Sequence, residues 1–260
     1  PINDKGNINP SDDQPFGIFG RSVSGVGDVN GDGYSDFIVN TAGPAGLNGK
    51  SAAFVVYGGP QNGASLNLSS GTIDPSRGYK ITTLGTNEQS RVSGAGDVNG
   101  DGLADIVFSD YADTTATQSA DRLGRAIVIF STTSGNAPVD PNTISGTNGF
   151  KIRGYNLGQN FTEVTSVGDV NGDGLADLGL ITSERLYVVF GKTSGTVIEL
   201  STFSAAQGFP FETNPNSIFS SVSSAGDMNG DGLNDIIVGD SQAGDNQVFV
   251  VYGRSSGGSI

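Results

Sequence analysis

Three residue types are absent from this sequence, which has no histidine, no cysteine and no tryptophan. Histidine is the commonest general base, and cysteine supplies thiol nucleophiles, zinc ligands and disulfides. Serine and threonine therefore have no histidine to activate them. Glutamate is scarce, and no motif singles out Asp110, Asp113 or Asp240 as a carboxylate pair for glycoside hydrolysis. We expect a protein that is not an enzyme.

Long apolar runs are also missing, since none approaches the ~20 residues that span a bilayer. Basic residues are few, at 13 against 27 acidic residues, and the formal net charge is −14. Binding to nucleic acid or to an anionic membrane needs a positive surface. We expect neither a nucleic-acid partner nor membrane insertion. No signal peptide is visible, and a chain that starts at Pro1 is consistent with one that was removed.

Glycine is abundant, at 41 of 260 residues, where an average protein has about 7%. The apolar residues, 35% of the chain, occur in short runs rich in β-branched and aromatic side chains. Such runs favour a packed β protein over a disordered chain.

One ten-residue pattern occurs four times, as Gly-Asp-Val-Asn-Gly-Asp-Gly-x-x-Asp with Met in place of Val in the last copy. The copies span residues 27–36, 96–105, 168–177 and 226–235. Their first aspartates are 69, 72 and 58 residues apart. This variable spacing favours repeated hairpin units with loops of different length over a regular solenoid.

Short apolar runs surround each copy at similar positions. One run follows immediately, at 37–39, 106–108, 178–180 and 236–238, and a second ends in Tyr57, Phe130, Phe190 or Tyr252. Three repeats continue into a weaker fourth element, at 78–81, 149–152 and 208–211. Four short strands per repeat, without a 3.6-residue periodicity, predict an all-β β-propeller of four-stranded antiparallel blades with very little helix. The recurring aromatic residues are expected in the core between blades.

The repeated loop offers oxygen atoms at fixed intervals. Counted from its first aspartate, it places side-chain oxygens at positions one, three, five and nine and a backbone carbonyl at position seven. Oxygen ligands without nitrogen or sulfur suit Ca²⁺ or Mg²⁺, and a flexible protein cage favours Ca²⁺. Glycine at position six permits a sharp turn. An EF-hand loop begins in the same way but needs a glutamate at position twelve, where this chain has apolar residues.

A plain hairpin turn is the alternative interpretation of Asn-Gly-Asp-Gly. A turn does not require acidic or amide oxygens at four fixed positions in four copies, so we expect about four bound Ca²⁺ ions. Carboxylates ~5 Å apart repel each other by about 3 kcal/mol per pair at an effective dielectric constant near 20, which a cation would relieve. Outside the loops the chain holds 15 acidic and 13 basic residues, so most of its net charge lies in the loops.

The segment 19–36, which starts with Phe-Gly and contains the first loop, resembles the FG-GAP repeats of the integrin α-subunit propeller and its bacterial relatives. The resemblance extends over nearly the whole chain as four repeats, although only the first has Phe-Gly in register. In that family the ion sits in the hairpin between the first two strands of a blade. The resemblance implies these ligands, with Tyr34 and the three leucines acting through their carbonyls: Asp28, Asn30, Asp32, Tyr34 and Asp36; Asp97, Asn99, Asp101, Leu103 and Asp105; Asp169, Asn171, Asp173, Leu175 and Asp177; Asp227, Asn229, Asp231, Leu233 and Asp235.

Residues 1–260 are expected to form a single FG-GAP propeller domain or a segment of one. The repeats span about 15–84, 85–155, 156–214 and 215–260, and the fourth has no evident fourth strand. Residues 1–14 supply that strand in one interpretation and close the ring. In the other two, the chain is a piece of a longer propeller, or it self-associates to complete a larger ring.

The resemblance implies an extracellular or cell-surface module for adhesion or protein interaction. A carbohydrate-binding propeller, or a non-catalytic accessory domain of a larger secreted enzyme, is the alternative. The low Ca²⁺ concentration of the cytosol also favours an extracellular location. A protein or glycan ligand is expected on the face opposite the Ca²⁺ loops, where variable loops gather. The longest such loop, at about 109–125, holds Asp110, Tyr111, Asp113, Asp121, Arg122 and Arg125, and is better explained as a solvated loop than as a binding site.

Overall fold

A computed structural model describes residues 18–42, 52–60, 66, 68, 71–82, 90–110, 123–135, 138–156, 160–182, 185–213, 218–241 and 247–255. These residues are almost entirely strands and turns, with two short 3-10 helices, η3 (Pro141–Thr143) and η4 (Leu200–Thr202). No helix in these ranges is long and apolar enough to cross a membrane. The expectation of an all-β protein with very little helix is confirmed.

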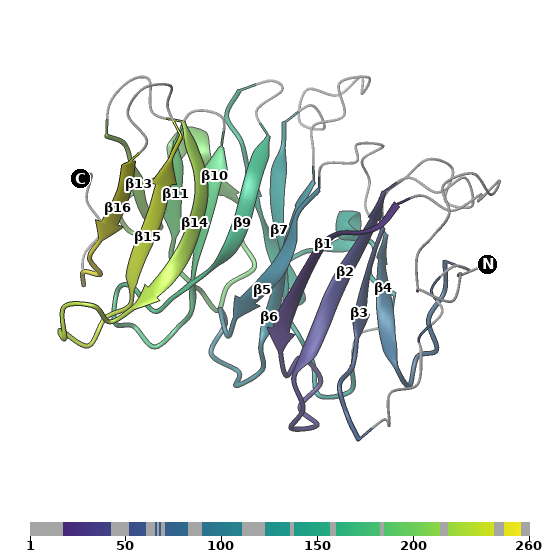
Figure 1. Ribbon diagram of the computed structural model, residues 1–260. Coiled ribbons are helices and arrows are strands. Elements are labelled where there is room, and N and C mark those ends of the chain that lie inside the picture. Colours follow the sequence, from purple (N-terminus) through teal and green to yellow (C-terminus); the bar gives the residue numbers. More distant parts are fainter. Residues whose placement is uncertain are drawn as a thin grey trace.

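Four sheets, which we call blades 1 to 4, follow one another along the chain (Figure 1). Blade 1 consists of β1 (Ile18–Gly27), β2 (Asp36–Ala42), β3 (Ala52–Val56) and β4 (Gly78–Thr82). Blade 2 consists of β5 (Val92–Gly96), β6 (Asp105–Asp110), β7 (Arg125–Ile129) and β8 (Gly149–Arg153). Blade 3 consists of β9 (Phe161–Gly168), β10 (Asp177–Thr182), β11 (Leu186–Val189) and β13 (Gly208–Phe211). Blade 4 has β14 (Phe219–Gly226), β15 (Asp235–Asp240) and β16 (Gln247–Val251) in the described part of the chain.

Each blade is an antiparallel up-and-down sheet whose first two strands are joined by one of the acidic loops. The first strands, β1, β5, β9 and β14, lie side by side in this order, and the sheets fan out from them (Figure 1). Blades 1 and 4 are at opposite ends of the row. Residues 1–14, which the sequence offers as a closing strand, lie outside the described residues.

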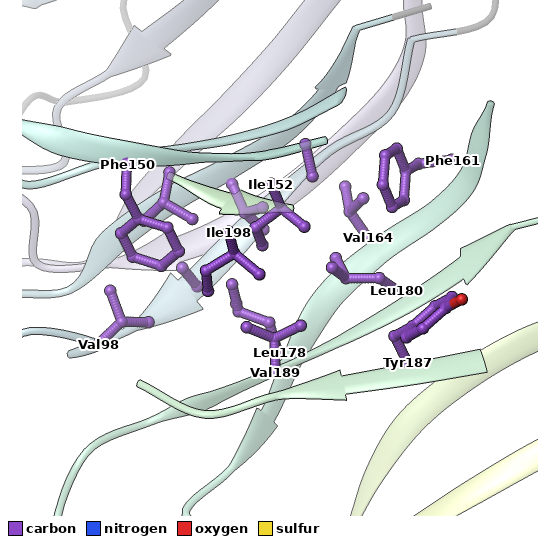
Figure 2. Close-up of a cluster of buried hydrophobic side chains, with 14 of the residues drawn as sticks. Val98, Phe150, Ile152, Phe161, Val164, Leu178, Leu180, Tyr187, Val189 and Ile198 are labelled. Atoms are coloured by element: carbon purple, nitrogen blue, oxygen red, sulfur yellow. The ribbon is translucent and has the colours of Figure 1, made fainter. Parts of the chain in front are cut away.

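The core lies between consecutive blades. Strands such as β3, β10 and β11 are buried on both faces, which explains their continuous apolar runs. Between blades 2 and 3 the side chains of Val98, Phe150 and Ile152 meet Leu178 and Val189 (Figure 2). Equivalent clusters fill the other two gaps between blades. Phe130 is buried and Tyr57 and Phe190 are partly buried in these cores, as expected. Tyr252 is 56% exposed, so its expected burial is wrong, because no strand among the described residues packs over this side of blade 4.

Neighbouring blades are also joined across their outer strands, which the sequence does not predict. The short strand β12 (Ile198–Glu199) belongs to the third repeat but pairs in parallel with β8 of blade 2. Val139 of the second repeat forms a parallel bridge to Ile81 of blade 1, and its carbonyl accepts the Thr82 N–H at 3.0 Å. The connection before the fourth strand of blades 2 and 3 therefore reaches back to the preceding blade.

Candidate metal-binding loops

The four acidic loops, residues 28–36, 97–105, 169–177 and 227–235, are called the aspartate loops, and their residues are numbered one to nine. They follow one another along the lower edge of the molecule in Figure 1. Their backbones are nearly superimposable in conformation. Glycine at position six has a φ of 86–90° in every copy, and glycine at position four has a φ of 77–80°. The expected need for positive φ at position six is confirmed.

Hydrogen bonds from each loop's own backbone fix the path of the chain. In the second loop, Oδ1 of Asp97 accepts the Gly100 N–H at 2.7 Å and Oδ2 accepts the Gly102 N–H at 2.8 Å. Oδ1 of Asp101 accepts the Leu103 N–H at 2.9 Å, and the Asn99 amide donates to Oδ2 of Asp101 at 3.0 Å. The other three loops repeat the same bonds within 0.1 Å. Each side chain at positions one, three and five thus faces the inside of its loop.

The aspartate at position nine differs from the others because it is buried at the start of the second strand. Asp36, Asp105, Asp177 and Asp235 are at most 2% exposed. Oδ2 of Asp105 accepts the Val98 N–H at 3.0 Å, and Oδ1 accepts the N–H of Ser131, which follows the third strand, at 2.8 Å. Gly58, Gly191 and Gly253 donate to the other three in the same way. This residue therefore joins the loop to two strands of its blade.

Burial makes the negative charge at position nine unfavourable in the second and third loops. Desolvation raises the pKa of Asp105 to about 7, two backbone N–H donors partly oppose it, and the carboxylates of Asp101 and Asp97 raise it further. The pKa of Asp177 is raised to about 7 for the corresponding reasons. A nearby cation would favour the ionised form of these groups.

The loops fit a hard cation in their donor chemistry. Every side-chain donor is a carboxylate or amide oxygen, and each carboxylate oxygen can accept more than one partner. In the described residues, however, no group of three or more acidic side chains is arranged to hold a metal ion. The carboxylates are turned toward N–H groups of their own loops and, at position nine, also toward the N–H that follows the third strand. The predicted ligand set, listed above for all four loops, stays a prediction.

Consecutive loops contact each other directly. The backbone N–H at position eight of one loop donates to the carbonyl at position one of the preceding loop: Ala104 to Asp28, Ala176 to Asp97 and Asn234 to Asp169, at 2.8–3.0 Å. The side chain at position seven lies over the glycine at position four of the preceding loop, as Leu175 does over Gly100. The loops therefore form one continuous row, a relationship that no spacing in the sequence reveals.

The surface opposite the loops is only partly described. Asp110 ends β6 and Arg125 begins β7, whereas Tyr111, Asp113, Asp121 and Arg122 lie outside the described residues. The expected binding loop at about 109–125 is therefore not tested by the structure.

Fan-like antiparallel sheets, each with an aspartate loop between its first two strands, define a repeat protein built from propeller blades. Comparison with family models specifies the repeat. Residues 19–57 match the FG-GAP repeat, and residues 169–238 match an FG-GAP-like repeat. The chain thus contains FG-GAP and FG-GAP-like repeats, which confirms the resemblance seen in the sequence. No curated protein matches the chain.

Proposed function

We propose that this protein is a non-catalytic, Ca²⁺-binding interaction module that works outside the cell. FG-GAP repeats are typically non-catalytic binding modules and often bind Ca²⁺, which supports this proposal. The observation that carries it is the fourfold recurrence of one loop conformation with the same oxygen-bearing side chains turned inward. A hairpin turn alone does not need a carboxylate at positions one, five and nine of every copy.

In this proposal Ca²⁺ has a structural role. It would be held by side chains at positions one, three, five and nine and by the carbonyl at position seven. The ion would offset the repulsion among three carboxylates, one of which is buried. Because position nine is tied to the third strand, each ion would stabilise a whole blade rather than its loop alone. Extracellular Ca²⁺ levels suit loops of this kind, and a protein ligand would bind the face opposite the loops.

Calorimetric titration with CaCl₂, combined with thermal unfolding, tests the proposal. We expect about four ions to bind, and we expect the Tm in millimolar Ca²⁺ to exceed the Tm in excess chelator, with Mg²⁺ giving a smaller effect. When the free Ca²⁺ concentration is 100 times the Kd of a site, that site adds about 2.7 kcal/mol to the free energy of unfolding. The combined variant Asp32→Asn, Asp101→Asn, Asp173→Asn and Asp231→Asn keeps an oxygen acceptor at each exposed position five, and should fold but lose binding.

Asp74→Asn is the matched control, because Asp74 is an exposed aspartate outside the loops that also accepts a backbone N–H, from Ser76. This variant should bind Ca²⁺ as the unmodified protein does. An identical Tm in chelator and in Ca²⁺, or full binding by the folded fourfold variant, would show that the loops are turns only.

A further inference from the structure

Each blade presents two apolar faces, one directed toward the preceding blade and one directed toward the following blade. We call these its backward face and its forward face. The forward face of blade 1 includes Ile38 and Val55, which are fully buried against Ile106 and Phe108 of the backward face of blade 2. The same arrangement recurs between blades 2 and 3 and between blades 3 and 4. The chain thus contains three copies of one type of interface.

The forward face of blade 4 carries apolar residues of the same type but is exposed. Val250 is 39% exposed, whereas its equivalents Val55, Val128 and Val188 are completely buried. The residues of this face are Met228, Ile237, Val248, Val250 and Tyr252. They occupy positions that the next blade covers in blades 1 to 3.

The backward face of blade 1, at the other end of the row, is exposed only in part, because Val39, Ala52 and Phe54 are buried there with Leu68 and Ile73 packed against them. Val23 is 65% exposed, whereas its equivalents Val92, Val164 and Val222 are at most 7% exposed. Phe37 is 45% exposed, and its counterparts in the other blades are buried. Of the ten large apolar side chains that are exposed in the described residues, all except Val197 and Ile218 are Tyr34 or belong to these two faces.

The aspartate loops at the two ends are also complementary to each other. In each internal interface, the side chain at position seven covers the glycine at position four of the preceding loop. Tyr34 occupies position seven of the first loop and is 48% exposed, while a Cβ added at Gly230, position four of the last loop, would meet nothing within 4 Å. Ser35 is at position eight of the first loop and Asp227 is at position one of the last loop. In each internal interface, the N–H at position eight donates to the carbonyl at position one of the preceding loop. The aspartate loops at the two ends are therefore complementary in the way that consecutive internal loops are.

We propose that two copies of this chain associate head to tail, with the forward face of blade 4 in one copy packed on the backward face of blade 1 in the other. Blades 1 and 4 lie at opposite ends of the row (Figure 1), so these faces meet between copies. The exposed residues of the two faces, together with the aspartate loops at the two ends, occupy positions that pack in the three internal interfaces. The interface is heterologous, so further copies add until the rotation closes a ring, and an open filament forms if it does not close. The proposal rests on the blade faces and does not depend on Ca²⁺ binding.

Analytical ultracentrifugation over a range of concentrations, in constant Ca²⁺, tests the proposal with one variant at each end. Val250→Asp blocks the forward face of blade 4, and Val23→Asp blocks the backward face of blade 1. We expect the unmodified chain to associate. For each variant alone, the Kd of self-association should rise at least tenfold, so that the variant is monomeric at concentrations where the unmodified chain associates. An equimolar mixture of the two variants should form a dimer and nothing larger, because only one intact pair of faces remains.

Val197→Asp is the matched control, since Val197 is 41% exposed but belongs to neither face, and this variant should associate as the unmodified chain does. Circular dichroism checks folding, and Val248→Asp, at a 69% exposed position, replaces Val250→Asp if the latter unfolds. A monomeric unmodified chain at every concentration, a mixture that stays monomeric, or self-association of both single variants would each overturn the proposal. The first outcome would point to closure within one chain, and the last to a symmetric interface elsewhere.

Discussion

Oδ1 of Asp105 accepts a hydrogen bond from the Ser131 backbone N–H at 2.8 Å, so the last residue of an aspartate loop holds the end of the third strand of its own blade. The other oxygen of the same carboxylate holds the Val98 N–H of the loop. Position nine is thus a structural junction as well as a proposed metal ligand.

The first prediction concerns this junction. Asp105→Asn should lower the free energy of unfolding by about 2 kcal/mol even in excess chelator, because an amide group cannot accept both buried N–H bonds. Urea denaturation measures the change. Asp74→Asn, at an exposed site, should change the stability by no more than about 0.5 kcal/mol. Equal stability of the two variants in chelator would mean that position nine matters only as a metal ligand.

The second prediction separates the individual loops. Asp32→Asn, Asp101→Asn and Asp173→Asn should each reduce the number of tightly bound Ca²⁺ ions by one, because the loops have the same hydrogen bonds and the same exposed aspartate at position five. Calorimetric stoichiometry measures this loss. A variant that loses all four sites at once would contradict one independent site per blade.

The third prediction compares two glycines at equivalent positions just before a loop. Gly96 and Gly226 both have positive φ, at 74° and 70°, so alanine is strained by about 1 kcal/mol at either site. A Cβ at Gly96 would also lie 2.6 Å from the Ala176 Cβ of blade 3, whereas a Cβ at Gly226 would meet nothing within 4 Å.

Gly96→Ala should therefore be less stable than Gly226→Ala by about 1–3 kcal/mol, the usual cost of overpacking. Chemical denaturation at low protein concentration measures both variants. Equal losses would show that consecutive blades separate easily enough to accept a methyl group between them.

The fourth prediction concerns pH. Burial raises the pKa of Glu163 on β9, although the Arg91 charge partly opposes the shift. The folded state therefore binds this proton more tightly than the unfolded state does, and ionisation of Glu163 reduces stability as the pH rises above its ordinary pKa. Glu163→Gln should be more stable than the unmodified protein at pH 7, and the difference should disappear near pH 4. Urea denaturation at both pH values measures it, and a variant that is less stable at pH 7 would show that attraction to Arg91 dominates.

Much of the fold can be predicted from the sequence because its signals are local. The apolar runs at 106–108 and 178–180 lie in strands β6 and β10, and the weak element at 149–152 lies in β8. The loop conformation is also local, since its glycines and its aspartates at positions one and five act within nine residues. The sequence does not show, however, that position nine of each loop is buried while positions one, three and five are exposed or half-buried.

Interactions between distant residues could not be predicted in this way. The partner of Asp105 at Ser131 lies 26 residues away, across a connection whose length differs in every repeat. Tyr252 has the sequence environment of Phe130, and only the order of the blades leaves it exposed. β12 has two residues, too few to show an alternating pattern, and its pairing depends on where β8 of another blade lies.

The parallel pairing of β12 with β8 also gives the chain a mechanical polarity. A pull on the carboxyl end that peels blade 3 away takes with it the strand that covers the outer edge of blade 2, so unravelling one repeat exposes the edge of the repeat before it. A pull on the amino end removes β4 of blade 1 from Val139 and leaves the sheet of blade 2 intact. The fold should therefore resist extension differently from its two ends.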